Sequence, residues 1–299
     1  MGIRVLVTGV SGFLGSWAVK GLADAGHQAI ASNVRCQDRL FRAILPETTP
    51  DQVTWRGLDV DDNDVVDTIV GEAAPEAIVH LAARLFPACR DEPAAAAQVN
   101  VVGHINVFEA ARRHGVGQVV YASSLAARLR HDDGTHRTIC GTFKHWNETF
   151  AATYFAEHVL PSVGLRPAIV YGPGREAGAT AFVNQAIAAT AANEPYQLPQ
   201  RWCSRLEYVE QVAAIFCQRA VDRRPGVGRF LDPDHRRRFY YRPWPVAPGC
   251  RVTDASDKPV KATAPDVVAA LQGLSGVWRD VDLDDGIRRT IDGMAQLNP

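Results

Sequence analysis

The chain has 299 residues, of which 46% are hydrophobic and 22% charged, so it can bury a large core and its composition argues against wholesale disorder. Its formal net charge of −1 gives no electrostatic reason to expect nucleic acid or an anionic membrane as a partner. No apolar run reaches the roughly 18 residues that a bilayer span requires. The N-terminus leads straight into a strand-like segment and has no cleavable signal pattern, so neither a membrane partner nor export is expected.

The cysteines and histidines give no metal-ligand pattern. The six cysteines lie far apart without a CxxC pair, and His131, His136 and His145 have no second ligand at metal spacing. The simplest interpretation is a cytoplasmic protein with reduced thiols and no metal site. The cysteines are Cys36, Cys89, Cys140, Cys203, Cys217 and Cys250.

The first half of the chain alternates short apolar runs with amphipathic stretches, which is typical of repeated βα units around a parallel sheet. Strands are predicted at 4–8, 28–32, 53–58, 77–81, 118–122 and 165–171, and their continuously apolar character suits strands covered on both faces. Helices are predicted at 14–25, 62–70, 94–114 and 139–160, the last ended by Pro161. The predicted fold is α/β, a Rossmann-like, doubly wound parallel sheet.

After Tyr171 the alternation of strand-like and helical segments ends. The run Gly172-Pro173-Gly174 breaks the chain, a helix poor in charge is predicted at 179–192, and a mixed region follows to the end. We therefore expect a first domain over 1–170 and, over 171–299, a smaller lobe that returns elements to the first domain.

The segment from Thr8 to Gly15 carries three glycines in the spacing G-x-x-G-x-x-G, directly after a strand and at the start of a helix. Glycine is needed there because the backbone turns sharply and approaches a pyrophosphate closely, while the helix N-terminus presents free N–H groups. The alternative is an ordinary βα turn, but the position at the start of a βαβαβ series favours dinucleotide binding.

The end of the second predicted strand indicates which dinucleotide is bound. A carboxylate at this place would take the ribose hydroxyls of NAD, but the chain reads Ser32-Asn33-Val34-Arg35. A guanidinium pairs with a 2′-phosphate, which a carboxylate would repel. Unless Arg35 is one more solvated arginine, NADPH is the expected cofactor and NADH the less favoured one. The region 1–170 is then expected to be an NADP-binding domain, and the region 171–299 mainly a substrate-binding lobe. The arginine run 236–238 is expected to be a solvated loop or to close over the cofactor or an acidic substrate group.

Several further motifs resemble those of the extended short-chain dehydrogenase/reductases, the NAD-dependent epimerase/dehydratase family. They are Asp59-Val60, the segments 80–83, 121–124 and 166–174, Asn100, and Tyr208 to Val212 with Gln211 where an acid is usual. The resemblance implies a small-molecule substrate, leaves a homodimer open, and implies a set of cofactor contacts. These are Gly9, Ser11, Gly12, Phe13, Leu14, Gly15, Asn33, Arg35, Asp59, Val60, Leu81, Ala82, Ala83, Asn100, Lys144, Pro167 and Val170.

The family's chemistry depends on a serine, a tyrosine and a lysine, and here the tyrosine is missing. Ser124 occupies the serine position, and the Y-x-x-x-K position reads from Cys140 to Lys144, followed by Glu148 as in many relatives. Cys140 and Lys144 share a helix face. A cysteine sulfur lies nearer the backbone than a tyrosine oxygen would, and a thiol is a weak donor. Ser124, Lys144 and Cys140 are the catalytic candidates. Of these, Cys140 is expected to pack as a small hydrophobic residue rather than to act as an acid.

Three explanations of the missing tyrosine stay open. The protein binds NADP without turnover, or another group such as Cys140, a water on Ser124, His131 or His136 supplies the proton, or the substrate supplies it. The last fits a ketone beside a phenol, and the combination is similar to tyrosine-lacking ketoreductases that act on angucyclinones. The favoured hypothesis is an NADPH-dependent ketoreductase of a hydroxyaryl ketone, an aromatic polyketide in antibiotic biosynthesis. The alternatives are a nucleotide-sugar epimerase or dehydratase and a non-catalytic NADP-sensing protein.

Overall fold

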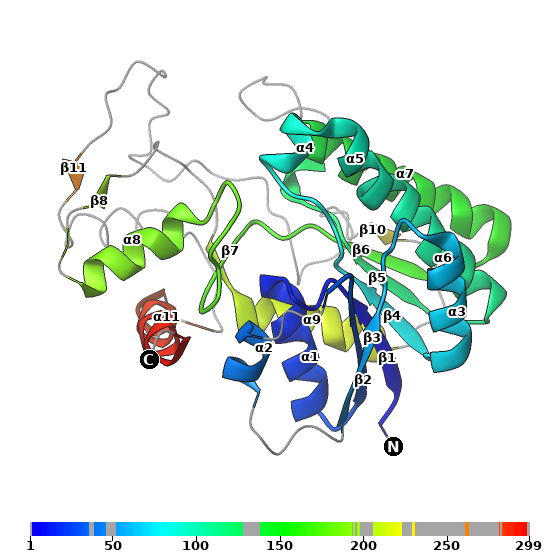
Figure 1. The fold of residues 1–299 in the computed structure, drawn as a ribbon, viewed down its shortest axis with the longest axis horizontal. Coiled ribbons are helices and arrows are strands. Elements are labelled where there is room, and N and C mark those ends of the chain that lie inside the picture. Colours follow the sequence, from blue (N-terminus) through cyan, green and yellow to red (C-terminus); the bar gives the residue numbers. More distant parts are fainter. Residues whose placement is uncertain are drawn as a thin grey trace. The chain divides into compact units, whose positions relative to one another are not determined.

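The computed structural model describes residues 2–35, 39–45, 52–127, 138–192, 194, 196–197, 206–222, 229–230, 261–262, 281 and 283–297. The chain separates into two compact units (Figure 1). The first consists of Met1–Pro167 with Val212–Tyr240, and the second of Ala168–Gln211 with Tyr241–Pro299. That the second unit binds the substrate stays a prediction.

The first unit is built on a seven-stranded sheet in which every strand pair is parallel. The strand order is β10-β6-β5-β4-β1-β2-β3. From β1 to β3 successive strands are added toward one edge of the sheet, and from β4 onward toward the other, so the strand order reverses between β1 and β4. This arrangement confirms the predicted α/β, Rossmann-like fold, and such a reversal is where ligands bind in open parallel sheets. The strands are β1 (Arg4–Thr8), β2 (Gln28–Asn33), β3 (Val53–Gly57), β4 (Ala77–His80), β5 (Val119–Ala122), β6 (Ser162–Leu165) and β10 (Arg229–Phe230).

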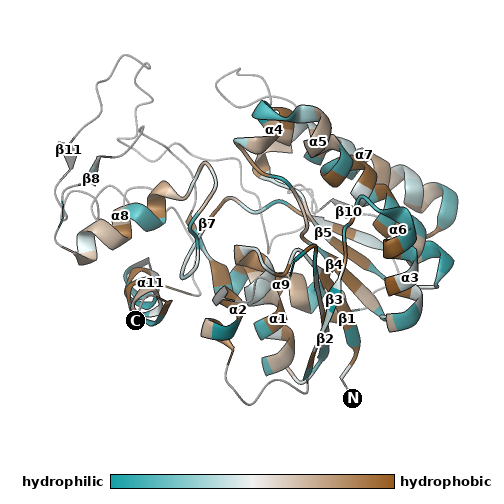
Figure 2. Cartoon of the chain, in the orientation of Figure 1, coloured by the Kyte–Doolittle hydropathy of each residue, from teal (hydrophilic) through white to brown (hydrophobic). Residues whose placement is uncertain are grey.

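Helices cover both faces of this sheet, whose strands are the brown, hydrophobic centre of Figure 2. On one face lie α1 (Phe13–Asp24), α2 (Arg39–Ile44) and α9 (Val209–Val221), and on the other α3 (Asn63–Ala73), α6 (Gly103–Arg113) and α7 (Ile139–His158) (Figure 1). The larger core cluster joins the strands to the second face, with Leu6, Ile78 and Phe108 almost wholly buried. Burial on both faces explains why the strands read as continuous apolar runs.

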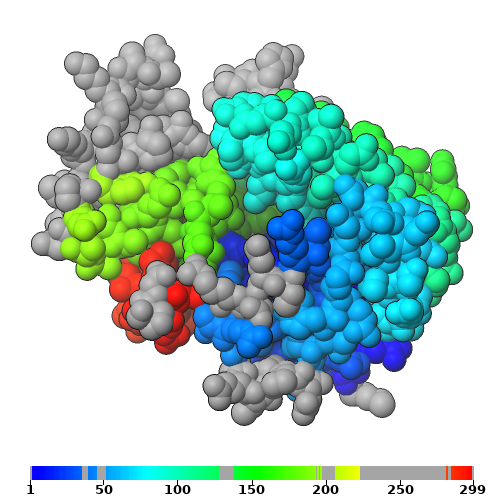
Figure 3. Space-filling view, viewed as in Figure 1, coloured from blue at the N-terminus to red at the C-terminus, as the bar shows by residue number. Residues whose placement is uncertain are grey.

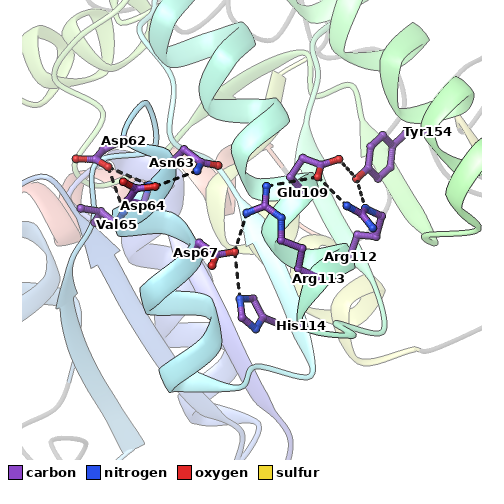
Figure 4. A network of polar contacts seen from close by, with 10 residues as sticks. All are labelled: Asp62, Asn63, Asp64, Val65, Asp67, Glu109, Arg112, Arg113, His114 and Tyr154. Carbon is purple, nitrogen blue, oxygen red and sulfur yellow. Dashed lines mark hydrogen bonds and ion pairs between the residues drawn. The ribbon is translucent and has the colours of Figure 1, made fainter.

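Polar contacts link the outer helices of the second face (Figure 4). Arg113 of α6 pairs with Asp67 of α3 at 2.9 Å. Arg112 donates to the hydroxyl of Tyr154 on α7 at 3.0 Å, and Glu109 accepts from both. Exposed pairs of this kind contribute little each, so the apolar core beneath supplies most of the stability of this layer.

Two predicted elements are divided in the structure, and a third ends earlier than predicted. The predicted strand 165–171 is wrong as one element: β6 ends at Leu165, Pro167 interrupts the run, and β7 (Ile169–Tyr171) pairs in a separate sheet. The predicted helix 94–114 is divided into α5 (Pro93–Ala97), a π-helical turn over Gln98–Val102, and α6. The helix predicted over 139–160 ends at His158, because Val159 takes a left-handed conformation with φ 58° before Pro161.

The second unit has its own core. Here β7 pairs in parallel with β9 (Leu206–Tyr208), and β8 (Tyr196–Gln197) pairs antiparallel with β11 (Lys261–Ala262). The helices α8 (Phe182–Ala191) and α11 (Leu283–Leu297) pack with β7 and β9 around Tyr171 and Ile187. The helices of the described residues are all too short or too polar to cross a bilayer.

Candidate functional site

The glycine loop lies between β1 and α1, and its glycines are required by close approaches. A Cβ on Gly9, whose φ is +76°, would lie 2.7 Å from the backbone nitrogen of Ala82, and one on Gly15 would lie 2.3 Å from the carbonyl oxygen of Gly9. The N-cap of α1 is Gly12, which makes no side-chain cap, and the first turn of α1 carries no acidic residue. The N–H groups at the start of this helix and its positive end therefore suit an anionic group such as a pyrophosphate.

Thr8 joins the glycine loop to the segment that follows β4. Its Oγ1 accepts from the backbone N–H groups of Leu81 and Ala82, each at 3.2 Å, and lies 2.8 Å from Nδ1 of His80. With two donors on the oxygen, the hydroxyl proton is directed to Nδ1, which places the ring proton of His80 on Nε2. Burial lowers the pKa of His80 to about 3, with a smaller contribution from the charge of Lys144, so the ring stays neutral.

The ends of β2 and β3 hold the residues predicted to face the adenosine part of the cofactor. The carbonyl oxygen of Arg35 accepts from Asn33 Nδ2 at 3.0 Å and from Ser11 Oγ at 3.2 Å, which ties this turn to the glycine loop. The residue Arg35 is exposed. Asp59 follows β3, and the buried Val60 beside it packs so closely on Gly103 that a Cβ there would lie 2.7 Å from the valine side chain.

Asn100 lies in the π-helical turn and holds the segment after β4. Its Oδ1 accepts from the backbone nitrogen of Arg84 at 2.7 Å, and its Nδ2 donates to the carbonyl oxygen of Arg84 at 2.9 Å and lies 3.5 Å from the sulfur of Cys89. The side-chain amide of Asn100 thus pairs with both backbone groups of Arg84, and Asn100 is 3% exposed. A π-helical turn is often found at a functional site.

The start of α7 is pressed against the 3₁₀ turn Leu125–Ala127 that follows β5. A Cβ on Gly141 would lie 2.2 Å from the carbonyl oxygen of Ala126, so only glycine allows this approach. One turn later, Nζ of Lys144 donates to the carbonyl oxygen of Ala122 at the end of β5, at 2.6 Å. Burial lowers the pKa of Lys144 to about 8, although the charge of Glu148 acts in the opposite direction.

Two serines end β5 and have different partners. Ser124 Oγ accepts from the backbone nitrogen of Ala126 at 3.2 Å, and the described residues provide no acceptor for its proton. Ser123 donates to the buried carboxylate of Glu148, which also forms a two-pronged ion pair with Arg166. The sequence pattern indicates the position of Glu148 but not its partners, because Arg166 and Ser123 are distant from it in the sequence.

Cys140 forms a disulfide with Cys89, with the two Cα atoms 5.6 Å apart. The expectation of reduced thiols is wrong for this pair, because the fold brings together two cysteines that are 51 residues apart. In the bridged state Cys140 has no thiol proton to donate. Cys217, the free cysteine among those the structure describes, is buried in α9, and burial raises its thiol pKa to about 12.

The structure thus gathers most of the predicted site residues at one edge of the sheet. The backbone of Leu81, Ala82 and Ala83 leads from β4, and the carbonyl of Pro167 accepts weakly from Leu125. Val170 is buried in β7 and belongs to the second unit. His131, His136 and the arginines 236–238 lie outside the described residues. Within the described part of the chain, no group of three or more His, Cys, Asp or Glu could hold a metal ion.

Comparisons with known proteins show where the chain belongs. It is 31% identical over 196 residues to a 2-alkyl-3-oxoalkanoate reductase of Stenotrophomonas maltophilia, and 31% identical over 201 residues to a UDP-glucose 4-epimerase of Mycolicibacterium smegmatis. These alignments cover 58% and 62% of the chain and 52% and 64% of the relatives, so the match spans between about half and two thirds of their length.

A structural comparison extends over almost the whole chain. The crystal structure of a UDP-glucose 4-epimerase of Thermus thermophilus, in complex with NAD, has a TM-score of 0.65 and 20% identity, covering 98% of this chain and 99% of that one. At this identity the likeness shows the fold. The sequence profile of the NAD dependent epimerase/dehydratase family matches residues 5–210. The chain therefore belongs to the NAD dependent epimerase/dehydratase family, as its glycine loop and the motifs at the strand ends predicted.

Proposed function

We propose that the first unit binds NADP(H) along the carboxyl ends of β1, β2 and β4. The uncapped N-terminus of α1 and the three closely packed glycines support the pyrophosphate position. NADP(H) is preferred to NAD(H) because Arg35 follows β2 where an acid would bind the ribose hydroxyls, and because two hydrogen bonds to its carbonyl group hold this residue beside the glycine loop.

We further propose that the protein reduces a ketone without a tyrosine acid. When bound, the reduced nicotinamide supplies the hydride. Lys144 holds the nicotinamide ribose, and the hydroxyl of Ser124 donates a hydrogen bond to the ketone oxygen, so both residues bind and orient the reacting groups. One observation carries this proposal: residue 140, where relatives have the tyrosine hydroxyl, is a cysteine bridged to Cys89, so the side chain at this place holds no exchangeable proton.

The proton then comes from the substrate or from solvent. When a ketone is hydrogen-bonded to its own neighbouring hydroxyl, the oxyanion formed on reduction is stabilised within the substrate. General acid catalysis increases a rate by about 10² to 10⁴, and this internal stabilisation recovers much of that increase. The substrate we favour is accordingly a hydroxyaryl ketone of the aromatic polyketide type.

The test follows nicotinamide absorbance with NADPH and, separately, NADH, on a peri-hydroxy aromatic ketone and on its methyl ether. We expect NADPH oxidation with the free phenol and little with the ether, because the ether has no proton to donate. Equal rates with both ketones would indicate that a group of the protein, and not the substrate hydroxyl, donates the proton. Tight NADPH binding without oxidation of several ketones would support a non-catalytic binding protein and would contradict the proposal.

A second candidate is a nucleotide-sugar epimerase or dehydratase, and the relatives give it more support than they give an aromatic ketone as substrate. A UDP-glucose 4-epimerase is among the relatives at 31% identity, although a ketone-reducing relative has the same identity. The bridged Cys140 counts against this candidate, since removing a proton from an unactivated sugar hydroxyl needs a base close to it. Incubation with UDP-glucose and NAD separates the two candidates: formation of UDP-galactose would favour the epimerase.

A further inference from the structure

The Cys89–Cys140 disulfide joins two walls of the proposed cofactor site. Cys89 lies in α4 (Ala88–Asp91), in the segment that follows β4, and Cys140 lies in the first turn of α7, one helical turn before Lys144. Asn100 extends the connection, because it contacts the sulfur of Cys89 and holds both backbone groups of Arg84. The bridge therefore ties the backbone that leads from β4 to the helix that presents the lysine.

The two sulfurs have different surroundings. Cys89 is 1% exposed, whereas Cys140 is half-buried at the start of its helix. The segment of α4 and α5 forms part of the surface of the first unit, shown in cyan in Figure 3, and residues 90–95 are exposed. A small thiolate attacks the accessible sulfur of a disulfide, so it would attack Cys140, and Cys89 would be the leaving group.

The site of Cys89 suits both oxidation states. As sulfur leaves, Nδ2 of Asn100, 3.5 Å away, donates a hydrogen bond to the developing thiolate. Once protonated, the thiol has an acceptor in the carbonyl oxygen of Arg84, 3.0 Å from the sulfur. A disulfide with no further purpose than to hold two segments together does not require polar partners for its reduced form.

We propose that Cys89 and Cys140 form a reversible thiol-exchange site, and that the bridged form holds the cofactor site in its binding geometry. A glutathione thiolate attacks Sγ of Cys140, the sulfur–sulfur bond breaks, and Cys89 leaves as a thiolate that takes a proton. A second glutathione thiolate attacks the glutathione sulfur of this mixed disulfide, so glutathione disulfide forms and Cys140 leaves as a thiolate that takes a proton. Two electrons pass from two glutathione molecules to the bridge, and glutathione disulfide reverses the reaction.

Reduction removes the covalent tie between α4 and α7, so the segment after β4 is less well ordered before the cofactor binds. Binding then includes the cost of ordering it. We expect reduced protein to bind NADPH about 5-fold or more weakly, the lower end of ordinary coupling between sites. Because such coupling is reciprocal, saturating NADPH must shift the glutathione equilibrium toward the bridge by the same factor. This effect rests on the proposed NADP(H) site, whereas the exchange itself does not.

The experiment equilibrates the full chain in glutathione buffers of graded thiol-to-disulfide ratio, with and without NADPH. Acid quenching, alkylation and peptide mass spectrometry give the bridged fraction, and calorimetry gives the Kd for NADPH at each end of the series. Cys140→Ser, with no bridge, should bind NADPH as weakly as the reduced chain in every buffer. Cys217→Ser, which removes the buried free cysteine of α9, should respond to glutathione like the unmodified chain.

A linked Cys89–Cys140 peptide that disappears and re-forms across the series, with matching shifts in Kd and in redox midpoint, would support the proposal. It would be overturned by the absence of the linked peptide in the most oxidising buffer, by a bridge that resists the most reducing one, or by equal Kd values in both states. If NADPH binds in neither state, the proposed cofactor site fails, while the mass measurement still decides whether the exchange occurs.

Discussion

Lys144→Met should make the cofactor-free protein more stable at neutral pH, because the lysine is buried at a cost. Burial lowers the pKa of Lys144 from 10.5 to about 8. At about 1.4 kcal/mol for each pKa unit, the charged form costs about 3 kcal/mol in the folded state. Methionine has a similar length and no charge, but it leaves the carbonyl oxygen of Ala122 without its donor, which costs about 1 to 2 kcal/mol. The net expectation at pH 7 is a gain of about 1 to 2 kcal/mol.

The gain should disappear as the pH rises. Below pH 8 the lysine is charged in both the folded and the unfolded chain, and the full cost is present. Between pH 8 and 10.5 the folded chain has lost the proton and the unfolded chain has not, so the unmodified protein becomes more stable with increasing pH. Above this range both states are neutral, and only the lost hydrogen bond separates the two proteins, with the variant now less stable.

Urea unfolding of both proteins between pH 6.5 and about 10 measures the difference, in which the titration of other groups cancels. Lys20→Met is the control, because it removes an ammonium from the surface pair with Asp24 and should change stability by less than about 1 kcal/mol at any pH. A difference for Lys144→Met that does not vary with pH, or a variant less stable at pH 7, would refute the reasoning. The variant should also bind NADPH more weakly, if Lys144 holds the ribose.

Further substitutions test the packing around the site. Gly141→Ala should lower the free energy of unfolding by about 1 to 3 kcal/mol, because its Cβ meets a carbonyl oxygen, whereas Gly57→Ala, which meets nothing within 4 Å, should change it little; urea unfolding compares them. Arg166→Ala leaves the buried carboxylate of Glu148 unpaired and should cost about 3 to 5 kcal/mol, against less than about 1 kcal/mol for Arg113→Ala at an exposed pair. Equal losses in either comparison would contradict the assigned contacts.

Local sequence patterns determined the fold class and the cofactor loop. The apolar runs at β1 to β5 and the glycine spacing after β1 are short-range signals. A strand covered on both faces must be apolar throughout, and a turn beneath a helix N-terminus needs glycine where two backbones approach closely. The amphipathic pattern of α11 was also present in the sequence, but it lies in a mixed region where no strand or cap signal marked it.

The contacts between distant segments were decided by the tertiary structure alone. The pairing of Cys89 with Cys140 across 51 residues, the bond between Thr8 and His80 and the ion pair of Glu148 with Arg166 have no local signature, because each depends on how α7 and the strand ends pack together. The sequence showed that the tyrosine was missing. The structure showed that the cysteine in its place is bonded to the segment after β4, since only the folded chain brings those two backbones within reach of a disulfide.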